Sequence, residues 1–145
     1  MDNNLKPQPN VQRAVPFFMV MNMIHSLDFY INGLGFELKM KWEPRGSIEW
    51  CCLDKGGAAL MLQEYRENNM PAENRGVGIS ICVMCNDALT IYKDAVTKGL
   101  SPAEPFVGNN LWVVEFTDPD GYKIFFESPT GLPEETRYSE WNGNA

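Results

Sequence analysis

The chain repeats one order of secondary structure, and this repetition limits the folds it can adopt. Apolar periodicity predicts a strand, a helix and three strands over residues 14–65, and the same order over residues 77–128. Matching residues recur at a spacing of 64 in three pairs: Gly35 and Gly99, Asp54 and Asp118, and Gly57 and Gly121. A shared order at a constant offset indicates an internal duplication.

Local signals define the expected elements within each half. Helices are expected after the capping residues Asn22 and Asp87. Helical spacing gives the first an apolar face of Ile24, Leu27, Ile31 and Leu34, and the second a face of Leu89, Tyr92 and Val96. Residues 36–42 alternate strictly, which predicts a half-buried strand. Its apolar side would hold Phe36, Leu38, Met40 and Trp42.

The expected organisation is a single domain at residues 14–128, as a chain of 145 residues allows. It divides into a first module (14–65), a linker (66–76) and a second module (77–128), with terminal extensions at 1–13 and 129–145. The acidic end is expected to be a solvated extension. An alternative is that Tyr138 and Trp141 dock it on a neighbouring molecule.

Charge and composition narrow the range of partners. The net charge of −7 argues against nucleic acid or an anionic membrane, because both require clusters of Lys and Arg. No apolar run approaches the roughly 20 residues of a membrane span. The first residues lack the apolar centre of a signal peptide, so a cytoplasmic location is expected, with the four cysteines reduced. The expected partner is therefore a small molecule.

The stretch FTDPDGYKIFFESP at residues 116–129 raises the question of a metal loop. Asp118, Pro119 and Gly121 occupy positions favoured in a type I turn. An EF-hand needs more oxygen ligands at alternating positions over twelve residues, and the stretch lacks them. In the duplicated half, Asp54-Lys-Gly-Gly57 keeps the turn but loses the second acid. The stretch is therefore predicted to be a turn between two strands.

Three short motifs resemble the vicinal oxygen chelate superfamily, which includes glyoxalases, extradiol dioxygenases, fosfomycin-resistance enzymes and bleomycin-resistance proteins. They are Phe29-Tyr30, Leu34-Gly35-Phe36 and Asp118 to Gly121. The resemblance covers roughly residues 14–128. It implies an α+β fold in which two βαβββ modules form an incomplete eight-stranded barrel, with helices outside and a ligand cavity within. It also implies that homodimers are common and that the pocket often borrows residues across the interface.

The enzymes of this superfamily hold a divalent metal ion through one His or Glu at each of four strand positions. By the resemblance, these positions fall at Val15, Met61, Gly78 and Phe125. None of these side chains offers a hard donor to a divalent cation. The sole histidine, His25, is expected on the surface of the first helix. We therefore expect no metal and no cofactor, and metal-dependent lyase, isomerase or dioxygenase activity is disfavoured.

This departure favours the metal-free bleomycin-resistance branch, whose opening strand commonly begins AVP, as residues 14–16 do here. Side chains alternate faces along a strand, so counting by two from the four metal positions extends the predicted cavity. Two strands contain no metal position. Glu49 and Glu115 orient these strands, because burying either carboxylate under a helix without a partner would be costly. The predicted cavity residues are Val15, Phe17, Met19, Glu49, Cys51, Met61, Gln63, Ser80, Glu115, Lys123, Phe125 and Glu127. Trp50, Cys52, Val114 and Phe116 are expected to pack under the helices.

The pattern predicts a protein that binds a small, cationic or aromatic molecule through carboxylates and aromatic faces. One alternative is an enzyme with a displaced metal site or with Glu115 or Glu127 as general base. Another is a filled barrel kept for dimerisation or regulation. Cys82 and Cys85 form a CxxC pair, but they lie at the end of a predicted strand rather than at the start of a helix. Inert thiols are therefore expected there.

Overall fold

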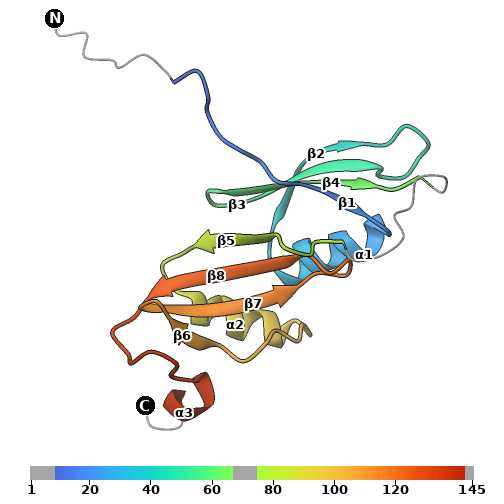
Figure 1. The fold of residues 1–145 in the computed structure, drawn as a ribbon. Coiled ribbons are helices and arrows are strands. Elements are labelled where there is room, and N and C mark those ends of the chain that lie inside the picture. Colours follow the sequence, from blue (N-terminus) through green and yellow to red (C-terminus); the bar gives the residue numbers. More distant parts are fainter. Residues whose placement is uncertain (1–8, 67–74, 143–145) are drawn as a thin grey trace, which may run out of the picture.

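The computed structural model describes residues 9–66 and 75–142 and contains two four-stranded sheets (Figure 1). The first sheet has the order β1-β4-β3-β2, with β1 at Phe17–Val20, β2 at Glu37–Trp42, β3 at Trp50–Lys55 and β4 at Ala58–Glu64. The second sheet has the order β5-β8-β7-β6, with β5 at Ser80–Met84, β6 at Phe106–Gly108, β7 at Leu111–Thr117 and β8 at Lys123–Pro129. The matching orders confirm the predicted α+β fold, but the sheets are not closed into a barrel.

Four helical segments accompany the sheets: α1 (Met23–Leu27), the π-helix η1 (Asp28–Gly33), α2 (Ala88–Thr97) and α3 (Tyr138–Asn142). Both predicted caps are confirmed. The Asn22 side chain accepts a hydrogen bond from the His25 N–H at 3.1 Å, and Asp87 accepts one from the Thr90 N–H at 3.1 Å. No helix within residues 9–66 and 75–142 has the length and apolar character that crossing a membrane requires.

The predicted apolar faces of the helices were partly wrong. Ile24 is 77% exposed, whereas Met23 and Tyr30 are buried. Met23, Tyr30 and Leu34 are themselves at helical spacing, so the buried stripe is rotated around the axis from the predicted one, a choice that periodicity alone leaves open. On α2, Leu89 is buried as expected, but Val96 is exposed.

Each sheet has one face under a helix and one face without helix cover. In Figure 1, α1 lies below the first sheet and α2 below the second. Leu62 of β4 is fully buried on the helix side, whereas its neighbours Met61 and Gln63 point the other way and are half-buried. On β8, Ile124 is buried on the helix side in the same manner. The buried side chains of both halves form one continuous core.

Strand β2 differs from the sequence prediction of a half-buried strand, because all six of its residues are exposed. The pairing with β3 shifts between Leu38 and Met40, which indicates a β-bulge. Leu38 pairs with Leu53 of the core, whereas Met40 pairs with Cys52 on the opposite face. The bulge therefore puts Leu38 and Met40 on opposite faces of the sheet, whereas strict alternation predicted them on the same face.

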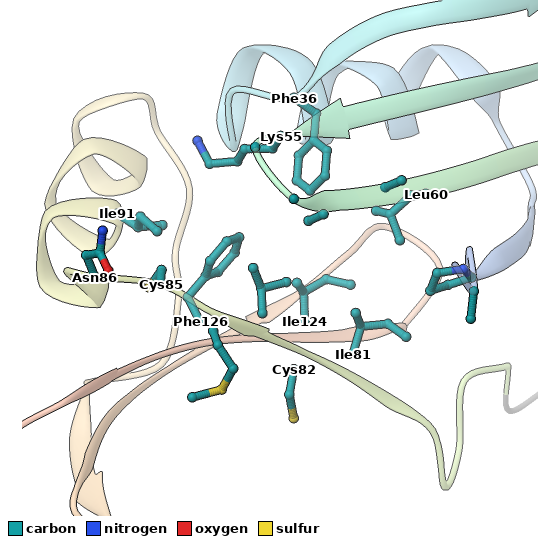
Figure 2. A pocket seen from close by; sticks show the side chains of 18 residues that line it. Phe36, Lys55, Leu60, Ile81, Cys82, Cys85, Asn86, Ile91, Ile124 and Phe126 are labelled. Atoms are coloured by element: carbon teal, nitrogen blue, oxygen red, sulfur yellow. The ribbon is translucent and has the colours of Figure 1, made fainter. Parts of the chain in front are cut away.

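The helix sides of the two halves meet along a seam. A groove of about 640 Å³ lies there, between the turn joining β3 to β4 and strand β5 (Figure 2). The C-terminal segment also packs on its own chain. Tyr138 and Trp141 contact the Trp112 ring, and the Val107 N–H donates to the Thr136 carbonyl at 2.9 Å. The prediction of a solvated extension was therefore wrong for this segment.

Candidate functional site

The candidate site consists of the two sheet faces that no helix covers. We call them the first open face and the second open face. The first open face carries Phe17, Met19, Met40, Trp42, Trp50, Cys52, Met61 and Gln63. The second open face carries Ser80, Cys82, Met84, Phe106, Val113, Glu115, Lys123, Phe125 and Glu127. Paired residues on neighbouring strands share a face, so the register of each pair fixes these sets.

The predicted cavity residues are divided between these two faces. Phe17, Met19, Met61 and Gln63 lie on the first open face, and Ser80, Glu115, Lys123, Phe125 and Glu127 lie on the second. Val15 precedes β1 and is half-buried. None of the twelve lines the groove along the seam. A single chain therefore does not gather them around one cavity.

The predicted orientation of β3 was wrong. Cys51 pairs with Leu62, is 0% exposed, and has its Sγ 3.9 Å from the Met23 Sδ of α1, so it lies under the helix. Trp50 and Cys52, expected under the helices, lie on the first open face instead. The error came from using Glu49 as the anchor.

Glu49 precedes β3, and its carboxylate has partners of its own. It forms an ion pair with Arg45 and lies 3.9 Å from an Arg66 guanidinium nitrogen. A paired carboxylate does not need to face a cavity, so its charge did not determine the orientation of the strand. On β7 the same reasoning was right, because Val114 and Phe116 are buried on the helix side.

The first open face is aromatic and rich in thioethers. Trp42 and Trp50 are directly paired across β2 and β3, and Trp42 is 47% exposed. Met40 is 61% exposed, and Met61 pairs with Phe17 on the adjacent strand β1. Flat rings beside flexible thioethers form a surface that adapts to apolar ligands of different shape.

The second open face carries more charge. The Lys123 ammonium lies 3.4 Å from a Glu115 carboxylate oxygen and 2.6 Å from the Thr117 hydroxyl. The Glu127 carboxylate makes no ion pair or side-chain hydrogen bond within the described residues. Phe125 lies opposite Glu115 on the neighbouring strand. This arrangement leaves one carboxylate available to a cationic group.

The residues present do not fit a divalent metal ion. Met61 lies on the first open face and Phe125 on the second, while Gly78 precedes β5 and has no side chain. Among the residues that the structure describes, no group of three His, Cys, Asp or Glu side chains is placed to share an ion. His25 is exposed on α1, as predicted.

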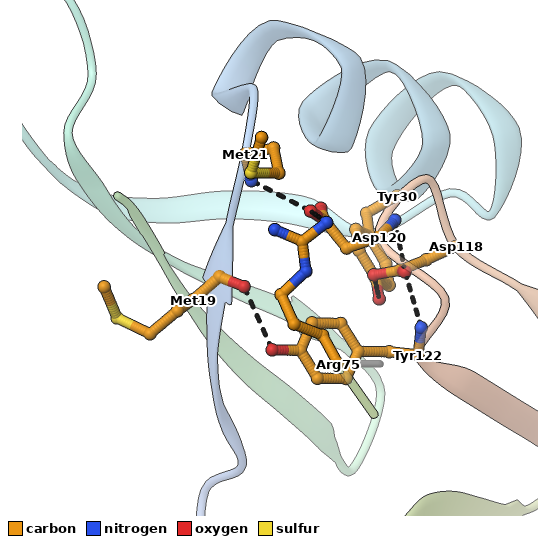
Figure 3. Close-up of polar contacts among 7 residues, drawn as sticks. All are labelled: Met19, Met21, Tyr30, Arg75, Asp118, Asp120 and Tyr122. Atoms are coloured by element: carbon orange, nitrogen blue, oxygen red, sulfur yellow. Dashed lines mark hydrogen bonds and ion pairs between the residues drawn. The ribbon is translucent and has the colours of Figure 1, made fainter. Parts of the chain in front are cut away.

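The DPDG stretch forms the predicted turn, closed by a hydrogen bond from the Gly121 N–H to the Asp118 carbonyl at 3.0 Å. Its carboxylates also join the two modules, which the sequence analysis missed (Figure 3). The Tyr30 hydroxyl donates to Asp118 Oδ2 at 2.8 Å, and Asp118 Oδ1 accepts the Asp120 and Tyr122 N–H groups. Burial raises the pKa of Asp118 and that of Tyr30.

Asp120 makes a second connection between the modules in the same cluster. Its Oδ1 accepts the Met21 N–H at 2.9 Å and lies 3.0 Å from the Arg75 guanidinium. The Tyr122 hydroxyl donates to the Met19 carbonyl at 3.0 Å. The signal that could have revealed this role is the joint presence of Phe29-Tyr30 and the DPDG motif.

The four cysteines are free thiols in different surroundings. Cys82 is exposed on the second open face, whereas Cys85 follows β5 and is half-buried. Burial raises the pKa of the Cys51 thiol to about 11 and raises that of Cys85 as well. The two sulfur atoms of the CxxC pair therefore lie in unlike environments. Cys85 is close to the start of α2, but burial outweighs the backbone hydrogen bond at Asp87 that would lower the pKa of its thiol.

Solved structures share this fold at low sequence identity. TioX from Micromonospora sp. ML1 is 16% identical, with a TM-score of 0.67 over 83% of this chain and 100% of that one. TnmS3, an antibiotic binding protein from Streptomyces sp. CB03234, is 21% identical, with a TM-score of 0.62 over 82% and 98%. A bleomycin-binding protein complexed with bleomycin is 18% identical, with a TM-score of 0.63 over 83% and 100%.

Among curated protein sequences, none matches this chain. A family model does match it over residues 13–126, which include the first module, all but the last two residues of the second, and all three motifs. The chain therefore belongs to the Glyoxalase/Bleomycin resistance protein/Dioxygenase superfamily.

Proposed function

We propose that this protein is a cytoplasmic homodimer that binds a small aromatic or cationic molecule between its open faces, without a divalent metal ion. The observation that carries the proposal is the pair of open sheet faces, one aromatic and one with an unpaired carboxylate. Large exposed apolar surfaces mark sites of interaction in soluble proteins.

A second copy of the chain is the occupant that completes the cavity. Two-fold pairing would place the first open face of one copy against the second open face of the other, and the reverse pair would form at the same time. Each cavity would then be lined by Trp42 and Trp50 from one copy and by Phe125 and Glu127 from its partner. This arrangement covers both apolar faces and creates two equivalent sites.

The side chains favour a flat ligand that carries a positive charge. Trp42, Trp50 and Phe17 offer ring faces for stacking and for cation–π contacts. The Glu127 carboxylate would pair with a cationic group in a desolvated cavity. The similar structures include one described as an antibiotic binding protein and one complexed with bleomycin, which supports ligand binding as the role of this fold here.

The test combines oligomeric state with ligand binding. Light scattering after size exclusion should give a dimer. Proflavine, a cationic tricycle, should raise the melting temperature more than acridone, a neutral tricycle of similar shape, and methylglyoxal should have no effect. Glu127→Gln should lower proflavine affinity about tenfold and leave acridone affinity unchanged. Asp94→Asn, an exposed acid on α2, is the matched control.

Two outcomes would reject the proposal. Unchanged melting temperatures with every compound, in a protein that is still a dimer, would favour a fold kept for assembly. Stoichiometric binding of Zn, Ni, Mn or Fe(II), measured by calorimetry and metal analysis, would instead favour an enzyme with a displaced metal site.

A further inference from the structure

The groove along the seam lies on the helix side of the two sheets, although Cys82 and Met84 of the second open face also belong to its lining. Its floor is made of side chains from the helix sides of the two sheets, including the buried residues Leu60, Ile124 and Phe126 (Figure 2). Ile81 and Ile91 add half-buried apolar surface from β5 and α2. The volume of about 640 Å³ is within the usual range for small-molecule sites.

One formal charge lies in the lining of this groove. Lys55, the last residue of β3, is the only charged residue among the described residues of the lining, and none of these is Asp or Glu. Its ammonium makes no ion pair or hydrogen bond within the described part of the chain. By contrast, Lys39, Lys41 and Lys123 all have carboxylate partners.

The other polar groups of the lining are neutral. Asn86 lies at the start of α2 and offers an amide. Burial raises the pKa of the Cys85 thiol, so it stays protonated at neutral pH and adds no negative charge. The groove therefore combines an extended apolar floor with one unpaired cation, which is complementary to an amphipathic anion.

We propose that the groove is a second ligand site, which takes an amphipathic carboxylate of the fatty-acid class with its head group at Lys55 and its chain along Ile81, Ile124 and Leu60. The preferred charge is opposite to that of the open faces, and neither the head-group residue Lys55 nor the apolar floor belongs to an open face, although Cys82 and Met84 line both sites. The two sites can therefore be tested independently.

The experiment is titration calorimetry on the full-length protein with decanoate, decanol and decylammonium, each below its aggregation limit. Decanoate should bind at least about tenfold more tightly than decanol, because a charge-assisted hydrogen bond replaces a neutral one, and decylammonium should bind most weakly. Lys55→Gln should reduce decanoate affinity about tenfold without changing decanol affinity. Lys93→Gln, an exposed lysine of α2, should bind decanoate like the parent protein.

A filling variant tests the location without removing charge. A Cβ at Gly57 meets no atom within 4 Å and the residue does not need a left-handed backbone, so Gly57→Leu should fold and narrow the groove. It should weaken decanoate and decanol alike. Equal affinities for decanoate and decanol would overturn the proposal. The proposal would also be overturned if Lys123→Gln lost decanoate affinity and Lys55→Gln did not, because the fatty acid would then bind on the second open face.

Discussion

The hydrogen bond between Tyr30 and Asp118 allows a direct test of how the two modules are held together. Tyr30 is fully buried, and its hydroxyl donates to Asp118 Oδ2 at 2.8 Å. Tyr30→Phe removes this donor but keeps the ring, which packs edge-on against Phe29 and Phe36 with centroids at 5.0 and 5.8 Å. The change therefore isolates the hydrogen bond from the packing of the core.

The expected loss follows from the charge of the acceptor. Hydrogen bonds to charged groups contribute roughly 1.5–3 kcal/mol, and the buried Asp118 keeps only its two backbone donors in the variant. We expect the free energy of unfolding to fall by that amount near neutral pH. Burial already raises the pKa of Asp118, and the Tyr30 hydrogen bond opposes that rise, so its removal should raise the pKa further.

The pH dependence of this loss has a defined sign. A carboxyl whose folded pKa lies above the unfolded value of about 3.9 binds its proton more tightly in the folded state, so its ionisation destabilises the fold as pH rises. The variant has the higher folded pKa of the two proteins. The difference in the free energy of unfolding between the parent protein and Tyr30→Phe should therefore be complete above that pKa. It should shrink as pH falls, because Asp118 then takes up its proton in both proteins.

The assay is urea unfolding at one fixed protein concentration, at about pH 7.5 and about pH 4.5, with the slope against urea compared between variants. Tyr92→Phe is the matched control, because Tyr92 occupies the corresponding helix of the second module and its hydroxyl has no hydrogen-bond partner among the described residues. The control should stay within about 0.5 kcal/mol of the parent protein. A Tyr30→Phe loss no larger than that, or one that grows on acidification, would refute the reasoning.

Three further perturbations test other parts of the structure. Phe125→Asp on the second open face should convert the proposed dimer to a monomer in light scattering, whereas Val96→Asp on α2 should not; a dimer in both would contradict the proposed interface. In the folded Phe125→Asp variant, whose second open face should be uncovered, iodoacetamide should modify Cys82 and spare Cys51, whose burial raises its pKa to about 11; equal labelling by mass spectrometry would be inconsistent with the fold. Asp87→Ala should remove the cap of α2 and lower the free energy of unfolding by about 1 kcal/mol. Hydrogen bonds at that helix end lower the pKa of Asp87. The stabilisation that the ionised Asp87 side chain provides should therefore be complete above its unfolded pKa and be lost as pH falls through its folded pKa.

Local chemistry made most of the fold predictable. Each sheet repeats the same strand order, as the internal duplication implied, and the capping side chains of Asn22 and Asp87 were identified from residue type alone. The failures lie in which of two adjacent helix stripes is buried and where a strand period is interrupted. Met23 rather than Ile24 packs in the core, and the bulge of β2 separates Leu38 from Met40. Tertiary packing decides both, so single-sequence periodicity does not reveal them.

The faces of the candidate site were predictable where alternation was counted from the metal positions that the resemblance supplied. Met61 and Phe125 lie inside β4 and β8, so counting by two from them assigned neighbours such as Gln63 and Glu127 to the open faces. The orientation of β3 was instead inferred from the charge of Glu49, which is paired with Arg45 and need not face a cavity, and Cys51 was consequently assigned to the wrong face. The proposed closure of the cavity does not follow from alternation along a strand, because it depends on surfaces that a single chain leaves uncovered.

The positions of the two most specific motifs explain why they identify the family and not the ligand. Phe29-Tyr30 and the DPDG turn meet through the Tyr30–Asp118 hydrogen bond in the core between the modules, away from both open faces. The side chains of the open faces, by contrast, come from alternate positions on several strands. No contiguous motif records them, and a change of ligand can therefore proceed by single substitutions on these faces while the motifs stay the same.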